Sequence, residues 1–148
     1  MGRSISEMTY ISDYLTLGEY ACSCCGRLPP DFHLHDINRP YLELVNIFDA
    51  VRATWGKPIP VTSGYRCPHH NKEIGGSPCS VHIFGLALDL DLADGNEVEE
   101  LFAIADMDFQ RLRIGKYTQT GTFLHIDIGY LINPRASTNW RRGVRWHD

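Results

Sequence analysis

The 148-residue sequence predicts an α+β fold, with a central antiparallel sheet and flanking helices. Three observations lead to this prediction. Apolar residues recur at the helical period in only two clear segments, several short segments alternate apolar and polar residues, and Gly and Pro turns separate them. Few helices together with short strands and tight turns are typical of an α+β domain.

Two segments have the pattern of amphipathic helices. The first covers residues 41–55, where Gly56 ends the helix and Pro58 prevents its return. Its apolar face consists of Tyr41, Leu44, Val45, Phe48, Val51 and Trp55. The second covers about residues 97–105, with Asn96 as the expected cap and Glu99 as its reciprocal partner. The first thirty or so residues are expected to be irregular.

Four segments are expected to be strands: residues 59–63, 86–92, 111–117 and 123–129. Pro60 places the first of them at a sheet edge, because proline cannot donate to a neighbouring strand. Residues 86–92 alternate leucines on one face with Asp89 and Asp91 on the other. Residues 123–129 alternate in the same way, with His125 and Asp127 on the polar face.

The composition excludes several classes of protein. A hydrophobic fraction of 43% and a charged fraction of 22% indicate a folded domain and exclude a disordered chain. The net charge of −4, with one dense basic run at residues 141–145, argues against a nucleic-acid partner. No segment approaches the ~20 apolar residues of a membrane helix, so we expect no membrane insertion. The first twenty residues lack the apolar core of a secretory signal, so synthesis in the cytoplasm without export is expected.

Five cysteines stand at Cys22, Cys24, Cys25, Cys67 and Cys79. Because their number is odd, they cannot all form internal disulfides, and thiols are the expected state of a chain without an export signal. Together they could form a small structural metal site, although their spacing is not the paired C-x-x-C of a zinc knuckle. The alternative is a set of buried free thiols.

The polar faces of two predicted strands indicate a candidate metal site. If residues 86–92 and 123–129 are neighbours, Asp89, Asp91, His125 and Asp127 converge on one side of the sheet, and His82 lies in the turn just before. Two imidazoles and a carboxylate with an open fourth position are the ligands of a catalytic zinc ion. The alternative is a solvated sheet face, and Asp91 in particular fits either a solvated position or an outer position behind the ligands.

Several motifs in order extend this interpretation. Residues 80–89 read S-x-H-x-x-G-x-A-x-D, and residues 123–127 read F-L-H-I-D. Residues 60–66, 71–76 and 114–117 add PVTSGYR, NKEIGG and IGKY. From about residue 41 to 146 the sequence resembles the zinc D-alanyl-D-alanine carboxypeptidases, the M15 peptidases, in a branch with the H-x-D motif. That family shares its fold with the hedgehog signalling domain.

The resemblance implies a fold and an organisation. It predicts a hedgehog/D,D-peptidase-like α+β fold, with a zinc peptidase domain at residues 41–148. Residues 1–40 would then be a cysteine-bearing extension packed on that domain.

The resemblance also implies the roles of single residues. His82, Asp89 and His125 would bind zinc, which lowers the pKa of bound water to about 7 and polarises the scissile carbonyl. Arg66 would stabilise the negative charge that develops on the carbonyl oxygen. The alternative role for Arg66 is a salt bridge on the surface. Ser80 would hold the turn or orient a ligand, as an outer partner of the site together with Asp91.

The general base departs from the family pattern. Many members carry Glu, Asp or His two or three residues before the last ligand, where this chain has Phe123 and Thr122. Asp127 is the nearest replacement, because it projects from the same strand face as His125. It could instead orient His125 or bind the metal itself. His69 and His70 are weaker candidates.

The sequence therefore predicts a zinc-dependent peptidase that acts as a monomer on peptidoglycan stem peptides or cross-bridges. A carboxypeptidase and an endopeptidase are both open. The expected setting is a phage endolysin or virion lysin, which reaches the wall by holin-dependent release or with the particle. The alternatives are a zinc-stabilised binding or structural module without catalysis, and a cytoplasmic peptidase for small D-amino-acid dipeptides.

Overall fold

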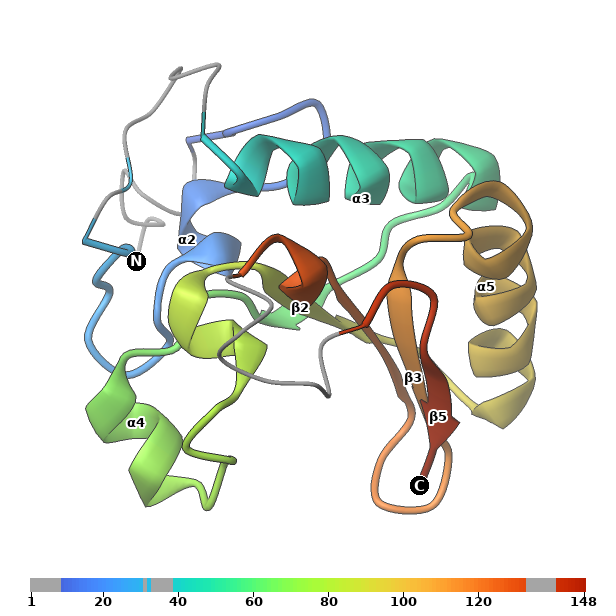
Figure 1. Cartoon of the computed structure of the whole chain (residues 1–148). Helices are drawn as coiled ribbons and strands as arrows, with labels where there is room; N and C mark the ends of the chain where they lie inside the picture. Colours follow the sequence, from blue (N-terminus) through green and yellow to red (C-terminus); the bar gives the residue numbers. More distant parts are fainter. Residues whose placement is uncertain (1–8, 31, 33–38, 133–140) are drawn as a thin grey trace.

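The computed structural model describes residues 9–30, 32, 39–132 and 141–148, and Figure 1 shows the chain. Its centre is a five-stranded sheet in the order β1-β2-β4-β3-β5. The strands are β1 (Val61–Ser63), β2 (Ala87–Asp91), β3 (Arg113–Tyr117), β4 (Phe123–Asp127) and β5 (Arg145–His147). Helices and sheet together confirm the predicted α+β class, and β1 lies at an edge as Pro60 indicates.

The sheet is antiparallel except at its far edge. Strands β1, β2, β4 and β3 pair antiparallel, whereas β5 runs parallel to β3. The fifth strand is an addition to the four expected, and at three residues it is too short to show an alternating pattern. It pairs with the outer edge of β3, where the amide of Ile114 donates to the carbonyl of Val144 at 3.0 Å.

The longer helices are α3 (Tyr41–Trp55) and α5 (Gly95–Asp108). Helix α3 has the predicted bounds and ends at Gly56, which adopts a left-handed φ of 81°. Helix α5 begins two residues before the predicted start, so the expected cap at Asn96 is wrong. Asp94 is the cap instead, because its carboxylate accepts a hydrogen bond from the amide of Glu97 at 2.9 Å.

Shorter helical turns lie in the connections. They are α2 (Leu17–Tyr20), α4 (Pro68–Glu73) and the 3₁₀ turns η1 (Val81–Phe84) and η2 (Gly129–Leu131). Helix α2 corrects the expectation of an irregular start. Thr16 and Glu19 form a capping box, in which each side chain accepts a hydrogen bond from the other residue's backbone amide, both at 3.1 Å.

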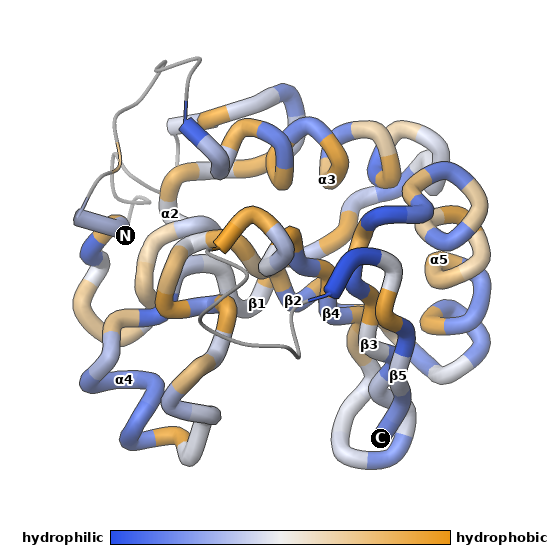
Figure 2. Tube along the Cα trace, in the orientation of Figure 1, coloured by the Kyte–Doolittle hydropathy of each residue, from blue (hydrophilic) through white to orange (hydrophobic). Residues whose placement is uncertain are grey.

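The core lies between one face of the sheet and the two long helices. Helix α5 packs against β3, β4 and α3 (Figure 1). The inward side chains of the two central strands are fully buried: Leu88, Leu90, Leu124 and Ile126. Figure 2 shows hydrophobic and hydrophilic residues alternating along helices α3 and α5. The opposite face of the central strands is left for polar residues.

The N-terminal segment contributes to the same core. Leu15 and Tyr20 are buried in one cluster with residues of α3 and the sheet, and the Tyr20 hydroxyl donates to the carbonyl of Gly85 at 2.7 Å. The boundary between residues 40 and 41 stays a prediction. None of the helices in the described part of the chain has the length and apolar character that a bilayer crossing requires.

Candidate metal centre

The candidate site is built on one row of residues that crosses the whole sheet. In the antiparallel register Asp89 of β2 lies opposite His125 of β4. Ser63 lies on the other side of Asp89, Gly115 on the other side of His125, and Trp146 beyond Gly115. Directly opposed residues point to the same face of a sheet, so this central row forms one line across the polar face.

His82 reaches this row from the turn η1. The hydroxyl of Ser80 accepts a hydrogen bond from the amide of His82 at 3.3 Å and caps the turn, and Gly85 ends it with a left-handed φ of 70°. The side chain of His82 is only 4% exposed. Of the two roles expected for Ser80, the contact it makes is the one that holds the turn.

The three candidate ligands face one another at close range. Nε2 of His82 lies 3.3 Å from Oδ2 of Asp89, and Nδ1 of His125 lies 3.0 Å from Oδ1 of Asp89. All three ligand atoms lie within 4.8 Å of one another. With metal–ligand bonds of about 2.0–2.1 Å, neighbouring ligand atoms of a tetrahedral zinc ion stand about 3.3 Å apart. The group therefore fits a tetrahedral metal ion with one open position.

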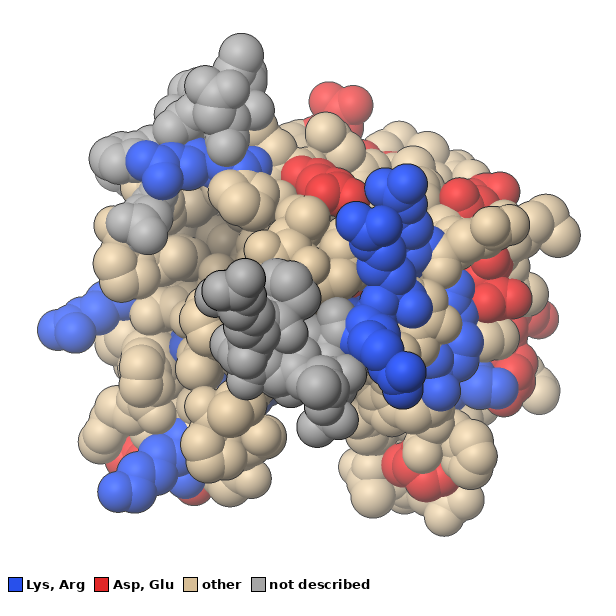
Figure 3. Space-filling model, viewed as in Figure 1, with Lys and Arg blue, Asp and Glu red and all other residues tan. Residues whose placement is uncertain are grey.

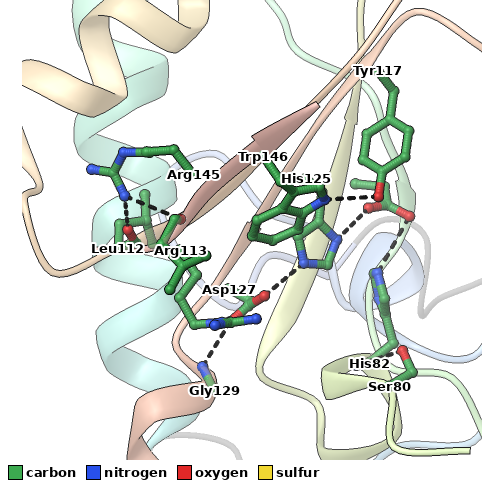
Figure 4. Close-up of polar contacts among 12 residues, drawn as sticks. Ser80, His82, Leu112, Arg113, Tyr117, His125, Asp127, Gly129, Arg145 and Trp146 are labelled. Carbon is green, nitrogen blue, oxygen red and sulfur yellow. Dashed lines mark hydrogen bonds and ion pairs between the residues drawn. The ribbon is translucent and has the colours of Figure 1, made fainter. Parts of the chain in front are cut away.

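The second nitrogen of each imidazole is already occupied. Nδ1–H of His82 donates to the carbonyl of Gly64 at 2.8 Å. Nε2–H of His125 donates to Oδ2 of Asp127 at 2.7 Å, a contact that Figure 4 shows. A carbonyl or carboxylate behind each histidine fixes its tautomer and leaves the other nitrogen free for a metal ion. Nε2 of His82 and Nδ1 of His125 are the nitrogens that face Asp89.

Burial and mutual contacts shift the pKa values of the three candidate ligands. Burial lowers the pKa of His82 and keeps this ring neutral. Burial alone would raise the pKa of Asp89, but the hydrogen bonds of His125 and His82 hold it well below its usual range. Burial alone would likewise lower the pKa of His125, yet the hydrogen bonds to Asp127 and Asp89 raise it to about 9, so Nδ1 of this ring must lose its proton when a metal ion binds.

Asp127 is enclosed behind His125. Its side chain is 1% exposed, and its Oδ1 accepts hydrogen bonds from Nε of Arg113 and from the amide of Gly129, both at 2.8 Å. Because Oδ2 accepts from His125, both carboxylate oxygens have donors. Of the three roles expected for Asp127, this geometry favours the orientation of His125.

Arg66 lies beside the ligands and is buried. Its Nη1 donates to Oδ1 of Asn71 at 2.9 Å and its Nη2 donates to the hydroxyl of Ser63 at 3.3 Å. Nη2 also lies 3.8 Å from Oδ2 of Asp89. Within the described residues, Nε of Arg66 has no hydrogen-bond partner. Because the side chain is only 11% exposed, the contact with Asp89 is not a surface salt bridge.

The remaining candidates lie farther from the ligands. Asp91 is exposed at the end of β2, which agrees with the solvated alternative. His69 is exposed and pairs with Glu73 within α4 at 3.0 Å, and Nε2 of His70 lies 3.2 Å from the hydroxyl of Ser23. These contacts point both histidines at groups outside the metal centre.

An aromatic border beside the site was not anticipated from the sequence. The ring of Trp146 lies 5.3 Å from that of His125, and its Nε1 donates to the hydroxyl of Tyr117 at 3.0 Å. Tyr117 in turn stacks on Phe123 at 4.3 Å. Gly115 makes this possible, because a side chain there would overlap the Trp146 ring. A glycine in the middle of a predicted strand is the signal that could have indicated this close approach.

The five cysteines do not share one place. The thiols of Cys22, Cys24, Cys25 and Cys67 come together in a second group, distinct from the three ligands above. Cys79 is exposed and is not part of that group.

Comparison with protein families identifies the family of the chain. The family model described as Peptidase M15 matches residues 14–127, well over half of the chain. The chain belongs to the M15 peptidase family. Membership in this family indicates a metallopeptidase with a peptidoglycan-type substrate. The match begins within the N-terminal segment and ends at Asp127. Comparison with curated proteins gives no significant match.

Proposed function

We propose that this M15 peptidase uses zinc to hydrolyse an amide bond in the stem peptide or cross-bridge of peptidoglycan, as a D,D-carboxypeptidase or an endopeptidase. The observation that carries the proposal is the position of Arg66. Its buried guanidinium lies 3.8 Å from the ligand Asp89, where a purely structural metal site needs no cation.

His82, Asp89 and His125 would hold the zinc ion. When bound, zinc supplies a water molecule with a pKa of about 7 and a Lewis acid for the scissile carbonyl. The chain supplies the geometry, because the carbonyl of Gly64 and the carboxylate of Asp127 fix the two imidazoles before the ion binds.

Arg66 would stabilise the negative charge that develops on the carbonyl oxygen. Asn71 and Ser63 hold its two terminal nitrogens, so the guanidinium is positioned before the substrate arrives. A fixed cation in a site of low solvent exposure stabilises such a charge more than the same group in water.

Asp127 would be a positioning residue and not the general base. A base must reach the attacking water, whereas the oxygens of Asp127 already accept hydrogen bonds from three donors. We propose that it holds His125 with Nδ1 toward the metal.

The surface charge fits an anionic target better than the net charge of −4 alone indicates. Figure 3 shows Lys and Arg side chains gathered on one side of the molecule, over the part where Figure 1 places β3 and β5. A local positive patch attracts a negatively charged polymer even when the whole protein is acidic. We propose the cell wall as the site of action, with delivery by holin-dependent release or by a virion, as in phage endolysins and virion lysins.

The decisive experiment follows the fragments of purified peptidoglycan by mass spectrometry. The zinc-loaded protein should release shortened stem peptides or separated cross-links, and a chelator should abolish this release. Arg66→Gln should lower the rate about 10²–10³-fold with zinc retained, since it removes one stabiliser of the oxyanion. The matched control is Arg52→Gln on α3, where the guanidinium lies over the Tyr14 ring at 4.5 Å.

Two outcomes would replace the proposal. Unchanged fragments with the intact zinc-loaded protein would favour a non-catalytic zinc-stabilised module. Cleavage of free D-amino-acid dipeptides, with peptidoglycan left intact, would favour a cytoplasmic dipeptidase.

A further inference from the structure

Four thiols from two distant parts of the chain meet at one point. Cys22, Cys24 and Cys25 lie in the loop that follows α2, and Cys67 directly precedes α4. Their sulfur atoms all lie within 4.8 Å of one another. All four are free cysteines, with Cys22 and Cys67 buried and the other two exposed.

The spacing of the sulfur atoms matches a metal tetrahedron. Sγ of Cys24 lies 3.6 Å from Sγ of Cys22 and 3.8 Å from Sγ of Cys67. With zinc–sulfur bonds of about 2.3 Å, the edge of a tetrahedron of four thiolates is about 3.8 Å long. These separations are far longer than the ~2.05 Å bond of a disulfide.

The backbone around the cluster supports thiolate ligands. The amide of Cys67 donates to Sγ of Cys22 at 3.4 Å, and the amide of His70 donates to Sγ of Cys67 at 3.3 Å. The loop is closed by a hydrogen bond from the amide of Gly26 to the carbonyl of Cys22 at 2.8 Å. Donors aimed at sulfur stabilise the deprotonated form that a metal ion requires.

We propose that Cys22, Cys24, Cys25 and Cys67 bind a second zinc ion, separate from the His82–Asp89–His125 centre. Four protein thiolates leave no open position, so this ion is structural and takes no part in hydrolysis. Sulfur ligands select a soft or borderline ion such as zinc and disfavour magnesium or calcium. Cys79 stands outside the cluster and is not a ligand.

The second zinc ion would join the N-terminal segment to the loop between β1 and α4, which carries Arg66 and Cys67. Cys67 follows Arg66 directly, and Cys22 lies two residues after Tyr20, whose carbonyl accepts from the amide of Tyr65 at 2.6 Å. The second ion would add a metal link to this backbone contact. It would therefore hold the loop that presents Arg66.

The test measures metal content in the full chain, purified with reducing agent and passed through gel filtration. The expected content is two zinc ions per chain. Cys24→Ser and Cys67→Ser should each lose one ion, and the matched control Cys79→Ser should keep both. His125→Ala should also lose one ion, but from the other site.

Substitution with cobalt identifies which ion is lost. Only a site with sulfur ligands gives an intense thiolate-to-cobalt charge-transfer band, because the His–Asp–His centre has no sulfur. The band should be present in the unaltered protein, in Cys79→Ser and in His125→Ala, and absent from Cys24→Ser. If the cysteine variants do not fold, the spectra of the unaltered protein and of His125→Ala still decide.

Three results would overturn the proposal. They are one zinc ion per chain without the charge-transfer band, an equal loss of metal in Cys79→Ser and Cys24→Ser, and a disulfide among the four cysteines of the reduced and metal-loaded protein. None of these results bears on peptidase activity, so this proposal and the proposed function can fail separately.

Discussion

Both ring nitrogens of His125 have a partner at the candidate site. One ring nitrogen faces the candidate metal position beside Asp89, and the other donates to Asp127. Asp127 is held in turn by Arg113 of the neighbouring strand. The orientation of one ligand therefore depends on a chain of buried polar contacts that ends in an ion pair.

Replacement of Asp127 by Asn tests this chain of contacts. The amide keeps the shape of the carboxylate but weakens the hydrogen bond from His125 and leaves Arg113 without its partner charge. Zinc affinity at the His–Asp–His centre should fall about 10–100-fold. Equilibrium competition with a chromogenic chelator measures this affinity.

The hydrolytic rate of Asp127→Asn in excess zinc shows whether Asp127 positions His125 or acts as the general base. If Asp127 only orients His125, saturating zinc should restore most of the hydrolytic rate of Asp127→Asn. A rate that stays low at full zinc occupancy would identify Asp127 as the general base. Asp91→Asn is the matched control, because this exposed carboxylate lies on the same strand as Asp89 and should change neither quantity.

Part of the site could be predicted from the sequence and part could not. The alternation of residues 86–92 and 123–129 places Asp89 and His125 on matching faces, and the structure brings them together with His82. The carbonyl that holds the second ring nitrogen of His82 could not be predicted from the sequence. The carbonyl of Gly64 reaches His82 across 18 residues, and only the packing of the segment after β1 against the turn η1 decides that contact.

At the scale of elements, the residue after β1 packs tightly against the end of α2. A Cβ atom on Gly64 would lie 2.6 Å from the carbonyl oxygen and 2.8 Å from the Cα of Tyr20. Both are backbone atoms, which cannot turn aside as a side chain can. The same residue presents its carbonyl to His82.

Gly64→Ala should therefore affect both stability and metal binding. We expect a loss of about 1–3 kcal/mol in the free energy of unfolding, because an added methyl group must push the two segments apart. Zinc affinity should fall as well, because the carbonyl that orients His82 moves with the backbone. Urea unfolding and chelator competition measure the two effects.

Gly95→Ala is the control for this prediction. A Cβ atom there would meet Thr118 at an ordinary distance of 3.7 Å, at the first residue of α5. Alanine at such a position is neutral or stabilising by up to about 1 kcal/mol. Equal destabilisation of the two variants would contradict the role assigned to the contact with Tyr20.

Some helices and strands could likewise be predicted from the sequence, and others could not. Helix α3 has the predicted bounds because its apolar period and its terminal glycine agree. The start of α5 differs because two possible caps, Asp94 and Asn96, stand close together and the chain uses the earlier one. Strand β5 was not foreseen because three residues carry no period, and its pairing is decided by the free edge of β3.

At the scale of the whole molecule, the N-terminal segment is part of the core. Leu15 is 0% and Tyr20 1% exposed, and the ring of Tyr20 packs against those of Phe32 and Tyr41. Removing two such buried side chains lowers the free energy of unfolding by about 2–5 kcal/mol each. That sum is comparable to the total stability of a typical domain, about 5–15 kcal/mol.

We therefore expect residues 41–148 alone not to form the native structure. Near-ultraviolet circular dichroism should lose its fixed aromatic signal, and a cooperative urea transition should be absent. The control is the chain from residue 9 onward, which keeps Leu15 and Tyr20 and should unfold cooperatively. A cooperative transition in the shorter fragment would establish residues 41–148 as an independent domain.

The central row also has a consequence for how the protein can diversify. Asp89, His125 and Gly115 are each the third residue of a five-residue strand, as far as possible from both strand ends. Insertions or deletions in the loops that follow β2, α5 and β3 would leave the distance between Asp89 and His125 unchanged, because strand register sets it. Substrate preference can thus change with the length and composition of these loops, while two of the three ligands keep their places in the sheet.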